Sequence, residues 1–311
     1  MRPTALFFAY MLGSLLLAAV FSAPLLQNQL IDAEPQRILA RLAQVIMLLG
    51  LWPFLHWLRL DHRTCLGFDQ ARRVFGRKLM LGWCLGTLMM GSIVALLLLS
   101  GARVFESWEP SLPLELAQTA LRALIAGLLI ALLEETFFRG ALFAALRRRH
   151  SLWSAASWSA ALYALVHFMK PQALPAGMVA DWSGIAWMLG SLFAGPLQLH
   201  HLDSLLALWL AGLLLALVRE RSGSLALGIG LHAGWVFVIQ VSRRLSDGVE
   251  TAPWSWLAGD YDGVIGLLAA VVLGLIIATE RLSLRRHRSE AATVPEPLEP
   301  LHAARESRKP G

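Results

Sequence analysis

Charged side chains are scarce in this chain of 311 residues: only 15% are Asp, Glu, Lys or Arg, whereas 57% are hydrophobic. A soluble domain carries about 25% charged residues, so the composition excludes an ordinary soluble fold. The sequence consists largely of long apolar runs, and a run of about 18 residues or more is typical of a transmembrane helix. We therefore expect an all-α membrane protein in a lipid bilayer.

Cysteine is nearly absent as well. Cys65 and Cys84 are the only two, and neither belongs to a metal-binding or disulfide pattern. The net charge of +6 does not indicate a nucleic-acid partner, because the basic residues gather just outside the apolar runs, as the positive-inside rule requires. No basic recognition module is visible either.

The apolar runs predict a polytopic bundle of about eight transmembrane helices. They lie at about residues 5–26, 38–58, 79–101, 118–146, 151–170, 203–218, 223–242 and 261–279. The first run resembles a signal peptide, but Pro24 opposes cleavage at its small-residue site, so we expect it to remain as a helix.

Segment 182–198 is apolar but is interrupted by three glycines and Pro196. The basic loop 59–78 indicates a cytoplasmic position, and the acidic loop 102–117 an outer one. If segment 182–198 crossed the membrane, the basic stretch 281–288 would lie outside. We therefore expect a re-entrant or interfacial segment there, with both termini cytoplasmic, in a multi-pass protein of a bacterial inner membrane.

Two adjacent carboxylates interrupt the predicted span 118–146. Each charge at the bilayer centre costs about 2.5–3.5 kcal/mol, so such residues are functional candidates. Glu135 and Arg139 are four residues apart and share one helix face, which favours an ion pair. Glu134 lies about 100° around the helix from Glu135. We interpret Glu135 and Arg139 as a structural pair and Glu134 as the carboxylate left for chemistry.

Later segments add histidines. Tyr163 and His167 lie four residues apart, and His232 lies in the span 223–242. A buried carboxylate can act as general base on a water molecule that a histidine shares, and a second histidine can donate to an oxyanion. A purely structural network of carboxylates and arginine is the alternative. Other candidates are interpreted as loop residues or a span-end anchor: His200, His201 and Lys170.

The order Glu-Glu-x-x-x-Arg at 134–139, aromatic-x-x-x-His at 163–167 and a third histidine on a later helix resembles the CAAX-protease and bacteriocin-processing (CPBP, or Abi) family of intramembrane proteases. The resemblance implies an endopeptidase that cleaves a membrane-associated protein or peptide. It also implies that Glu134 and His167 activate water and that His232 helps to form the oxyanion hole. The supporting residues would be Glu135, Arg139 and Tyr163.

Two positions depart from the family's pattern. Tyr163 stands where phenylalanine is usual, and Val236 stands where asparagine or aspartate is usual. A valine side chain cannot donate a hydrogen bond to an oxyanion, and the only asparagine in the chain is Asn28. Trp235 and Gln240 are the alternative donors near this position.

One carboxylate and two histidines also form a possible zinc set, with Glu134, His167 and His232 as ligands. The chain has no His-Glu-x-x-His motif, and we expect no cofactor, with zinc as the alternative. Two other functions stay open. The chain could be a non-catalytic scaffold or immunity factor, or a transporter whose ionisable groups relay protons.

These observations divide the chain into four regions. Residues 1–117 hold the N-terminal transmembrane helices, and residues 118–242 hold the CPBP-like catalytic core. Residues 243–281 hold a loop and the last transmembrane helix. Residues 282–311 are polar and rich in Pro, Glu and Arg, which predicts a disordered cytoplasmic tail.

Overall fold

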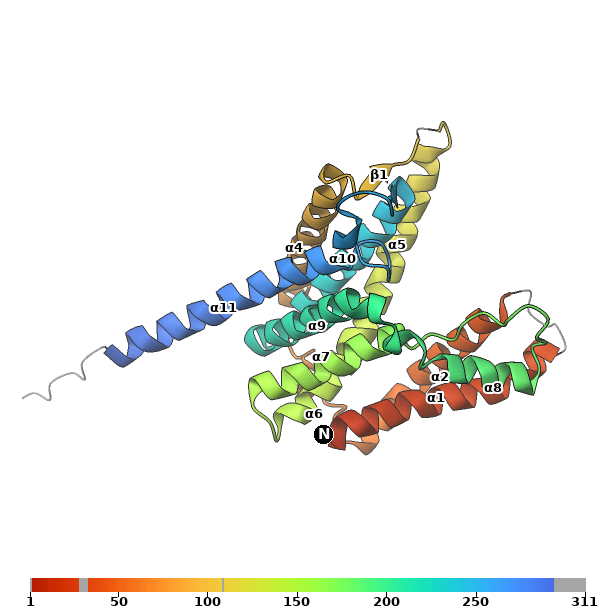
Figure 1. Ribbon diagram of the computed structural model, residues 1–311. Coiled ribbons are helices and arrows are strands. Elements are labelled where there is room, and N and C mark those ends of the chain that lie inside the picture. Colours follow the sequence, from red (N-terminus) through yellow and green to blue (C-terminus); the bar gives the residue numbers. More distant parts are fainter. Residues whose placement is uncertain (1, 28–32, 108, 294–311) are drawn as a thin grey trace, which may run out of the picture. The chain divides into compact units, whose positions relative to one another are not determined.

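The computed structural model describes residues 2–27, 33–107 and 109–293, and these are largely helical (Figure 1). The long helices are α1 (Arg2–Gln27), α2 (Pro35–Trp57), α4 (Arg72–Leu99), α5 (Leu112–Glu135), α7 (Leu152–Phe168), α9 (Leu202–Ser222), α10 (Ala226–Leu245) and α11 (Leu267–Thr293). The shorter elements are α3 (Arg63–Leu66), the π-helix η1 (Thr136–Leu142), α6 (Phe143–Arg147), α8 (Trp182–Ser191) and three 3-10 turns, η2 (Gly195–Leu197), η3 (Leu199–His201) and η4 (Ser255–Leu257).

The protein is an all-α membrane protein, as predicted. Among the described residues, five helical stretches are long and apolar enough to cross a bilayer: Arg2–Gln27, Pro35–Trp57, Arg72–Leu99, Leu112–Arg147 and Leu199–Ser222. Large apolar side chains such as Leu49, Leu88 and Leu121 stand exposed on these helices, as lipid-facing residues do. The other three predicted spans overlap α7, α10 and α11.

Segment 182–198 does not form a spanning helix. It holds the ten-residue α8 followed by a 3-10 turn, and ten helical residues extend only about 15 Å, half the thickness of the hydrocarbon core. The helix begins where Asp181 Oδ1 accepts hydrogen bonds from the backbone N–H groups of Ser183 and Gly184, at 2.9 and 3.0 Å. This N-cap sets its start.

The prediction for the tail needs a correction. Helix α11 continues to Thr293, whereas the composition predicts disorder from residue 282. Leu, Arg, Glu and Ala make up most of residues 280–293, and their high helix propensity lets the helix continue beyond its apolar part. The rest of the predicted tail, 294–311, lies outside the described residues. Among the described residues, those up to 273 form one compact unit, and residues 274–293 belong to a second.

Helices α4 and α10 approach each other through glycine. A Cβ atom on Gly230 would lie 2.1 Å from the Leu79 carbonyl oxygen, and one on Gly82 would lie 2.3 Å from that of Leu227. No side chain fits between the backbones at these points. Each helix carries a second glycine four residues further on, Gly86 and Gly234, and such spacing is typical of close helix pairs in membranes.

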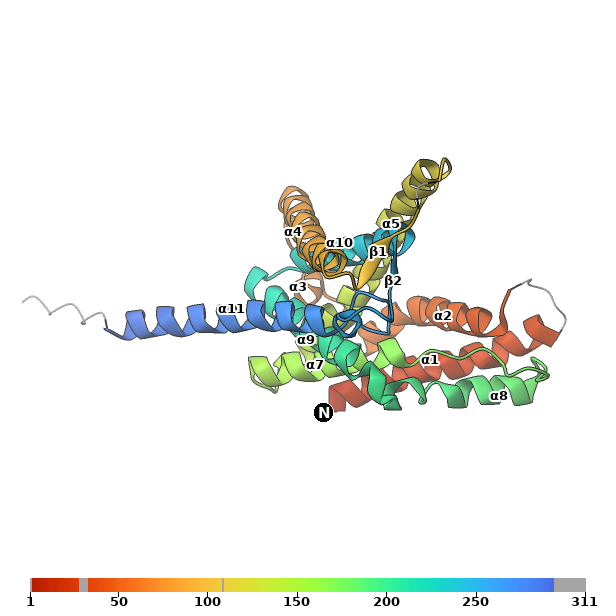
Figure 2. The same ribbon diagram turned by 45° about the horizontal axis from the view of Figure 1, so that its top comes forward.

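Other helix pairs surround this one. Helix α1 lies beside α2 and α8, and α7 lies beside α9 (Figures 1 and 2). Helix α5 packs against α10. These neighbours bring α5, α7 and α10, which carry the three candidate motifs, to one place.

A short two-stranded sheet joins two loops. Strand β1 (Arg103–Phe105) pairs antiparallel with β2 (Ser246–Gly248), with Val104 opposite Asp247. The buried guanidinium of Arg103 donates to the Ser246 hydroxyl at 3.0 Å and to the Gly263 carbonyl at 2.9 Å. Arg103 therefore ties the loop before α11 to the end of α10.

Candidate active site

The two glutamates lie where α5 changes its winding. The α-helix ends at Glu135, and the chain continues without a break as the π-helix η1. A π-helical insertion is rare and is often found at functional sites. All of η1 except Thr136 is buried, so the wider turn lies in the protein interior.

Glu135 and Arg139 form an ion pair. Arg139 Nη1 lies 2.8 Å from Glu135 Oε1, and both side chains are completely buried. The Arg139 guanidinium also lies 4.2 Å from the centre of the Tyr163 ring, a cation–π distance. The structure thus contains the pair that the helical spacing predicts, and adds an aromatic contact from α7.

Glu135 also holds a histidine. The same Oε1 atom lies 3.0 Å from His232 Nδ1 on α10, and His232 is only 4% exposed. Spacing along one helix cannot reveal a partner on another, so the sequence does not predict this contact. The contact between Glu135 and His232 fixes the orientation of the His232 ring.

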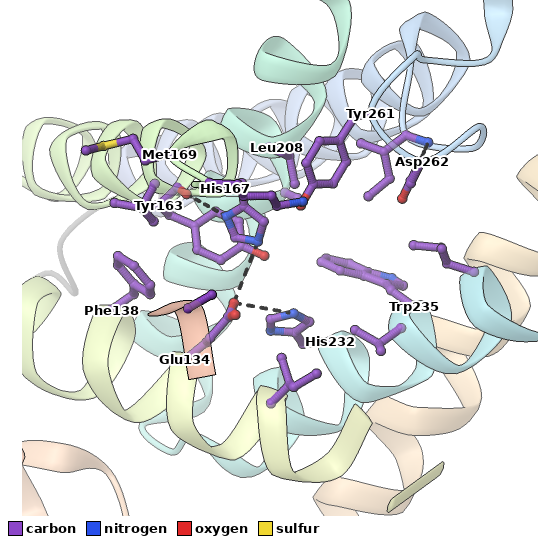
Figure 3. Close-up of a pocket in the computed structure, with 18 of the residues that line it drawn as sticks. Glu134, Phe138, Tyr163, His167, Met169, Leu208, His232, Trp235, Tyr261 and Asp262 are labelled. Carbon is purple, nitrogen blue, oxygen red and sulfur yellow. Dashed lines mark hydrogen bonds and ion pairs between the residues drawn. The ribbon is translucent and has the colours of Figure 1, made fainter. Parts of the chain in front are cut away.

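Glu134 faces both histidines. Its Oε2 atom lies 3.8 Å from His167 Nε2 and 3.8 Å from His232 Nε2 (Figure 3). This oxygen accepts no hydrogen bond from any described residue, while 30% of the Glu134 side chain is exposed. The structure therefore brings together the three predicted catalytic residues, each from a different helix, with Glu134 in the middle.

The hydrogen bonds of the two rings assign their tautomers. His167 Nδ1 lies 2.7 Å from the backbone carbonyl oxygen of Tyr163, and His232 Nδ1 lies beside the Glu135 carboxylate. Both partners only accept, so each Nδ1 carries the hydrogen. In the neutral rings, both Nε2 atoms are therefore acceptors on the side of Glu134.

A cavity of about 720 Å³ opens in front of this cluster. Helices α1, α2, α4, α5, α7, α9 and α10 line it, together with the loop before α11 and the first residues of that helix. Its wall is mainly apolar and includes five methionines, Met11, Met47, Met89, Met90 and Met169. Methionine adapts to ligands of different shape, so the cavity suits an apolar chain of variable sequence.

Sequence reasoning missed the part of this wall that comes from the loop before α11. Tyr261 and Asp262 line the cavity, and no motif around them signals this. Lys170 also lines it and donates to the Tyr261 hydroxyl at 3.0 Å, so it is more than the span-end anchor we expected. His200 and His201 do not line the cavity, in keeping with their interpretation as loop residues.

Val236 lines the cavity and presents only an apolar side chain. Beside it, the Trp235 indole nitrogen is buried and has no hydrogen-bond partner among the described residues. Gln240, one turn later, also lines the cavity. The donor that the family's asparagine usually supplies is therefore absent from position 236.

A zinc ion would suit the chemical types of the three side chains Glu134, His167 and His232, but it would not suit the distances between their ligand atoms. Carboxylate oxygen and imidazole nitrogen are zinc ligands, and both Nδ1 atoms are held by acceptors, as in many zinc sites. However, tetrahedral ligand atoms lie about 3.3–3.4 Å apart, and the Oε2–Nε2 distances are 3.8 Å. Within residues 2–27, 33–107 and 109–293, no group of three or more His, Cys, Asp or Glu has metal-binding spacing.

Comparison with known proteins agrees with this geometry. A family model described as Rce1-like, type II CAAX prenyl endopeptidase, matches residues 116–238. The match contains all three motifs and nearly coincides with the predicted core, 118–242. No curated protein and no solved structure matches the chain. Residues 116–238 are thus similar to type II CAAX prenyl endopeptidases, which supports the predicted resemblance to the CAAX-protease and bacteriocin-processing family.

Proposed function

We propose that this protein is an intramembrane endopeptidase that hydrolyses a peptide bond in a membrane-associated protein or peptide. The observation that carries the proposal is the position of Glu134, whose Oε2 atom lies 3.8 Å from each of two histidine Nε2 atoms at the wall of the cavity. That distance is too long for a direct hydrogen bond and suits contact through one water molecule.

In the proposed reaction, Glu134 and His167 hold the attacking water through its two hydrogens. Glu134 takes one proton, the water oxygen bonds to the carbonyl carbon, and the π electrons of the carbonyl move to its oxygen. When the C–N bond breaks, its electron pair stays on nitrogen, which receives the proton from Glu134. The products are one carboxylic acid and one amine, so atoms and charges balance.

His232 is proposed to stabilise the negative oxygen of the intermediate. Its Nδ1 is committed to Glu135, so it donates from Nε2 only as an imidazolium. The Glu135 carboxylate, which is paired with Arg139, lies against Nδ1 of the ring and is the proposed counter-ion of that imidazolium. The proposed roles thus divide the two adjacent glutamates: Glu134 exchanges protons, and Glu135 positions a charge.

The cavity supports an apolar substrate segment. Its wall comes mainly from helices and is largely aliphatic and thioether, which suits a stretch of a membrane protein that enters from the bilayer. The chemistry uses groups that the chain itself supplies, and the proposal needs no metal ion.

Contacts between the basic segments support an orientation in the membrane. The basic segments after α2, α6 and α9 contact one another, since Arg147 pairs with Glu220 at 2.7 Å and Arg219 donates to the Cys65 carbonyl at 3.2 Å. Strands β1 and β2 pair two further loops, which we place on the other side of the membrane. We place the basic side in the cytoplasm of a bacterial cell, with both termini there.

The test is to find an uncleaved precursor. Membrane proteomes of cells with wild-type protein, Glu134→Gln and Glu109→Gln are compared, and Glu109→Gln serves as the matched control because Glu109 lies in the outer loop, away from the cavity. We expect a longer form of at least one membrane protein only with Glu134→Gln. The purified wild type should then cleave that precursor in detergent.

Identical proteomes for the three strains would refute the proposal. Normal growth of a Glu134→Gln, His167→Ala double variant under conditions that require the gene would support a non-catalytic scaffold. Proton-coupled solute uptake by proteoliposomes would support a transporter.

A further inference from the structure

The proposed reaction lacks an uncharged donor for the developing oxyanion. Val236 has none, and His232 has one only when it is doubly protonated, because its Nδ1 hydrogen is held by Glu135. An oxyanion hole normally uses preorganised donors, and loss of one costs about 10²–10³-fold in rate. Another hydroxyl or N–H group on the cavity wall would have to supply this donor.

The Tyr163 hydroxyl meets the requirements. Tyr163 is only 2% exposed and lines the cavity. No described residue forms a hydrogen bond with its hydroxyl, although its backbone carbonyl accepts from His167. In Figure 3 the hydroxyl points into the cavity, on the side where Glu134 and His167 face each other.

The surroundings of Tyr163 hold the ring in one place. The His167 ring lies 4.4 Å away on the same helix, and the Phe138 ring packs edge-on at 5.2 Å. The His232 ring lies 6.1 Å away. The Arg139 guanidinium stands over the ring at 4.2 Å, and a cation there draws electron density from the phenol, which makes its O–H a stronger donor. Arg139 thus forms an ion pair with Glu135 and a cation–π contact with Tyr163.

We propose that the Tyr163 hydroxyl donates a hydrogen bond to the carbonyl oxygen of the scissile bond as that oxygen becomes negative, in place of the donor missing at Val236. The inference rests on the proposed function. The phenol keeps its proton throughout, so the balance of the reaction is unchanged. The chain's two departures from the family pattern then compensate each other: one removes a donor, and the other supplies one.

Other groups of the wall fit this role less well. The Trp235 indole nitrogen is buried without a hydrogen-bond partner among the described residues, and Trp235 lies on α10 rather than on the helix that carries His167. The Tyr261 hydroxyl accepts from Lys170 and keeps its own hydrogen, but it lies on a loop rather than on a helix that carries a motif. Tyr163 instead shares a helix face with His167.

The experiment measures cleavage of a fluorogenic peptide that spans the cleavage site of the precursor accumulated with Glu134→Gln. For Tyr163→Phe we expect kcat to fall about 10²-fold, with KM within about twofold. Binding of a peptide with a phosphonate at the scissile position, which mimics the charged tetrahedral intermediate, should weaken by a similar factor. Tyr10→Phe is the matched control, because the Tyr10 hydroxyl bonds to the Met47 carbonyl between α1 and α2.

Rescue gives a second readout. Val236→Asn in the Tyr163→Phe background restores the family pattern, and we expect it to recover at least tenfold of the lost kcat. Wild-type kcat in Tyr163→Phe would overturn the inference, as would an equal loss in Tyr10→Phe. A loss in Trp235→Phe or Tyr261→Phe with normal Tyr163→Phe would assign the role to that side chain instead.

The two proposals fail in different ways. Cleavage by Glu134→Gln at the wild-type rate removes the proposed function. Loss of cleavage in Glu134→Gln together with full activity in Tyr163→Phe removes only the role of the hydroxyl.

Discussion

His232 is held by Glu135: the Nδ1 atom of the histidine lies 3.0 Å from the carboxylate Oε1. The same oxygen accepts from Arg139 Nη1 at 2.8 Å. One buried carboxylate therefore joins α10 to η1 and orients a ring of the candidate site. The stability of the helix packing and the geometry of the site depend on the same atom.

The two adjacent glutamates should respond differently to the same substitution. Glu134→Gln should lower cleavage about 10²–10⁴-fold, the contribution of a general base. Its thermal stability should stay nearly unchanged, because Glu134 Oε2 has no hydrogen-bond partner among the described residues and lies 3.8 Å from each histidine.

Glu135→Gln should lose both activity and stability, because it leaves the Arg139 charge buried without its counter-ion. Breaking a buried pair costs about 3–5 kcal/mol. Unfolding curves in detergent and cleavage rates check both variants. Equal stability of Glu134→Gln and Glu135→Gln would contradict the division of roles.

Arg139 should be one of the most sensitive arginines in the chain. Arg139→Met keeps much of the side-chain volume but removes the arginine partner of the buried Glu135 carboxylate, so we expect a loss of about 3–5 kcal/mol in the free energy of unfolding. The matched control is Arg147→Met. Arg147 and Glu220 are about one-third exposed (34% and 33%), and such a pair contributes only about 0–1 kcal/mol. Similar losses in both variants would be inconsistent with the buried network.

The contact between α4 and α10 should not tolerate a methyl group. In Gly230→Ala the new Cβ would lie 2.1 Å from the Leu79 carbonyl oxygen, so the helices must separate. We expect a strong decrease in folded protein, measured by size-exclusion chromatography in detergent. Gly91→Ala on α4 is the control, since a Cβ there meets nothing within 4 Å, and alanine favours the helix by about 0.5–1 kcal/mol. A normal yield of Gly230→Ala would argue against this packing.

Chelation separates the two proposed chemistries. If Glu134 activates water without a metal, cleavage should be the same with 1,10-phenanthroline and with its non-chelating 1,7 isomer. Loss of activity with the chelator alone, followed by recovery with zinc, would instead assign a metal to Glu134, His167 and His232. Metal analysis of the purified protein gives a readout that does not depend on activity.

Local spacing anticipated part of the site. The pair Glu135 and Arg139 follows from helical periodicity, and so does the shared face of Tyr163 and His167. The motif order along the chain also indicated the family, which the match over residues 116–238 bears out. In contrast, nothing near Tyr261 signals that its loop lines the cavity, because the strand pair and Arg103 bring it there.

The sequence by itself determined the helices. A backbone in lipid must satisfy its own hydrogen bonds, so each long apolar run becomes a helix, and its period decides which residues share a face. Only the tertiary structure decided which faces meet. Glycine lets α4 and α10 touch. The packing of α5 against α10, and of α7 against η1, places Glu134 3.8 Å from both His167 and His232. These distances depend on contacts between segments far apart in the chain, and no local pattern encodes them.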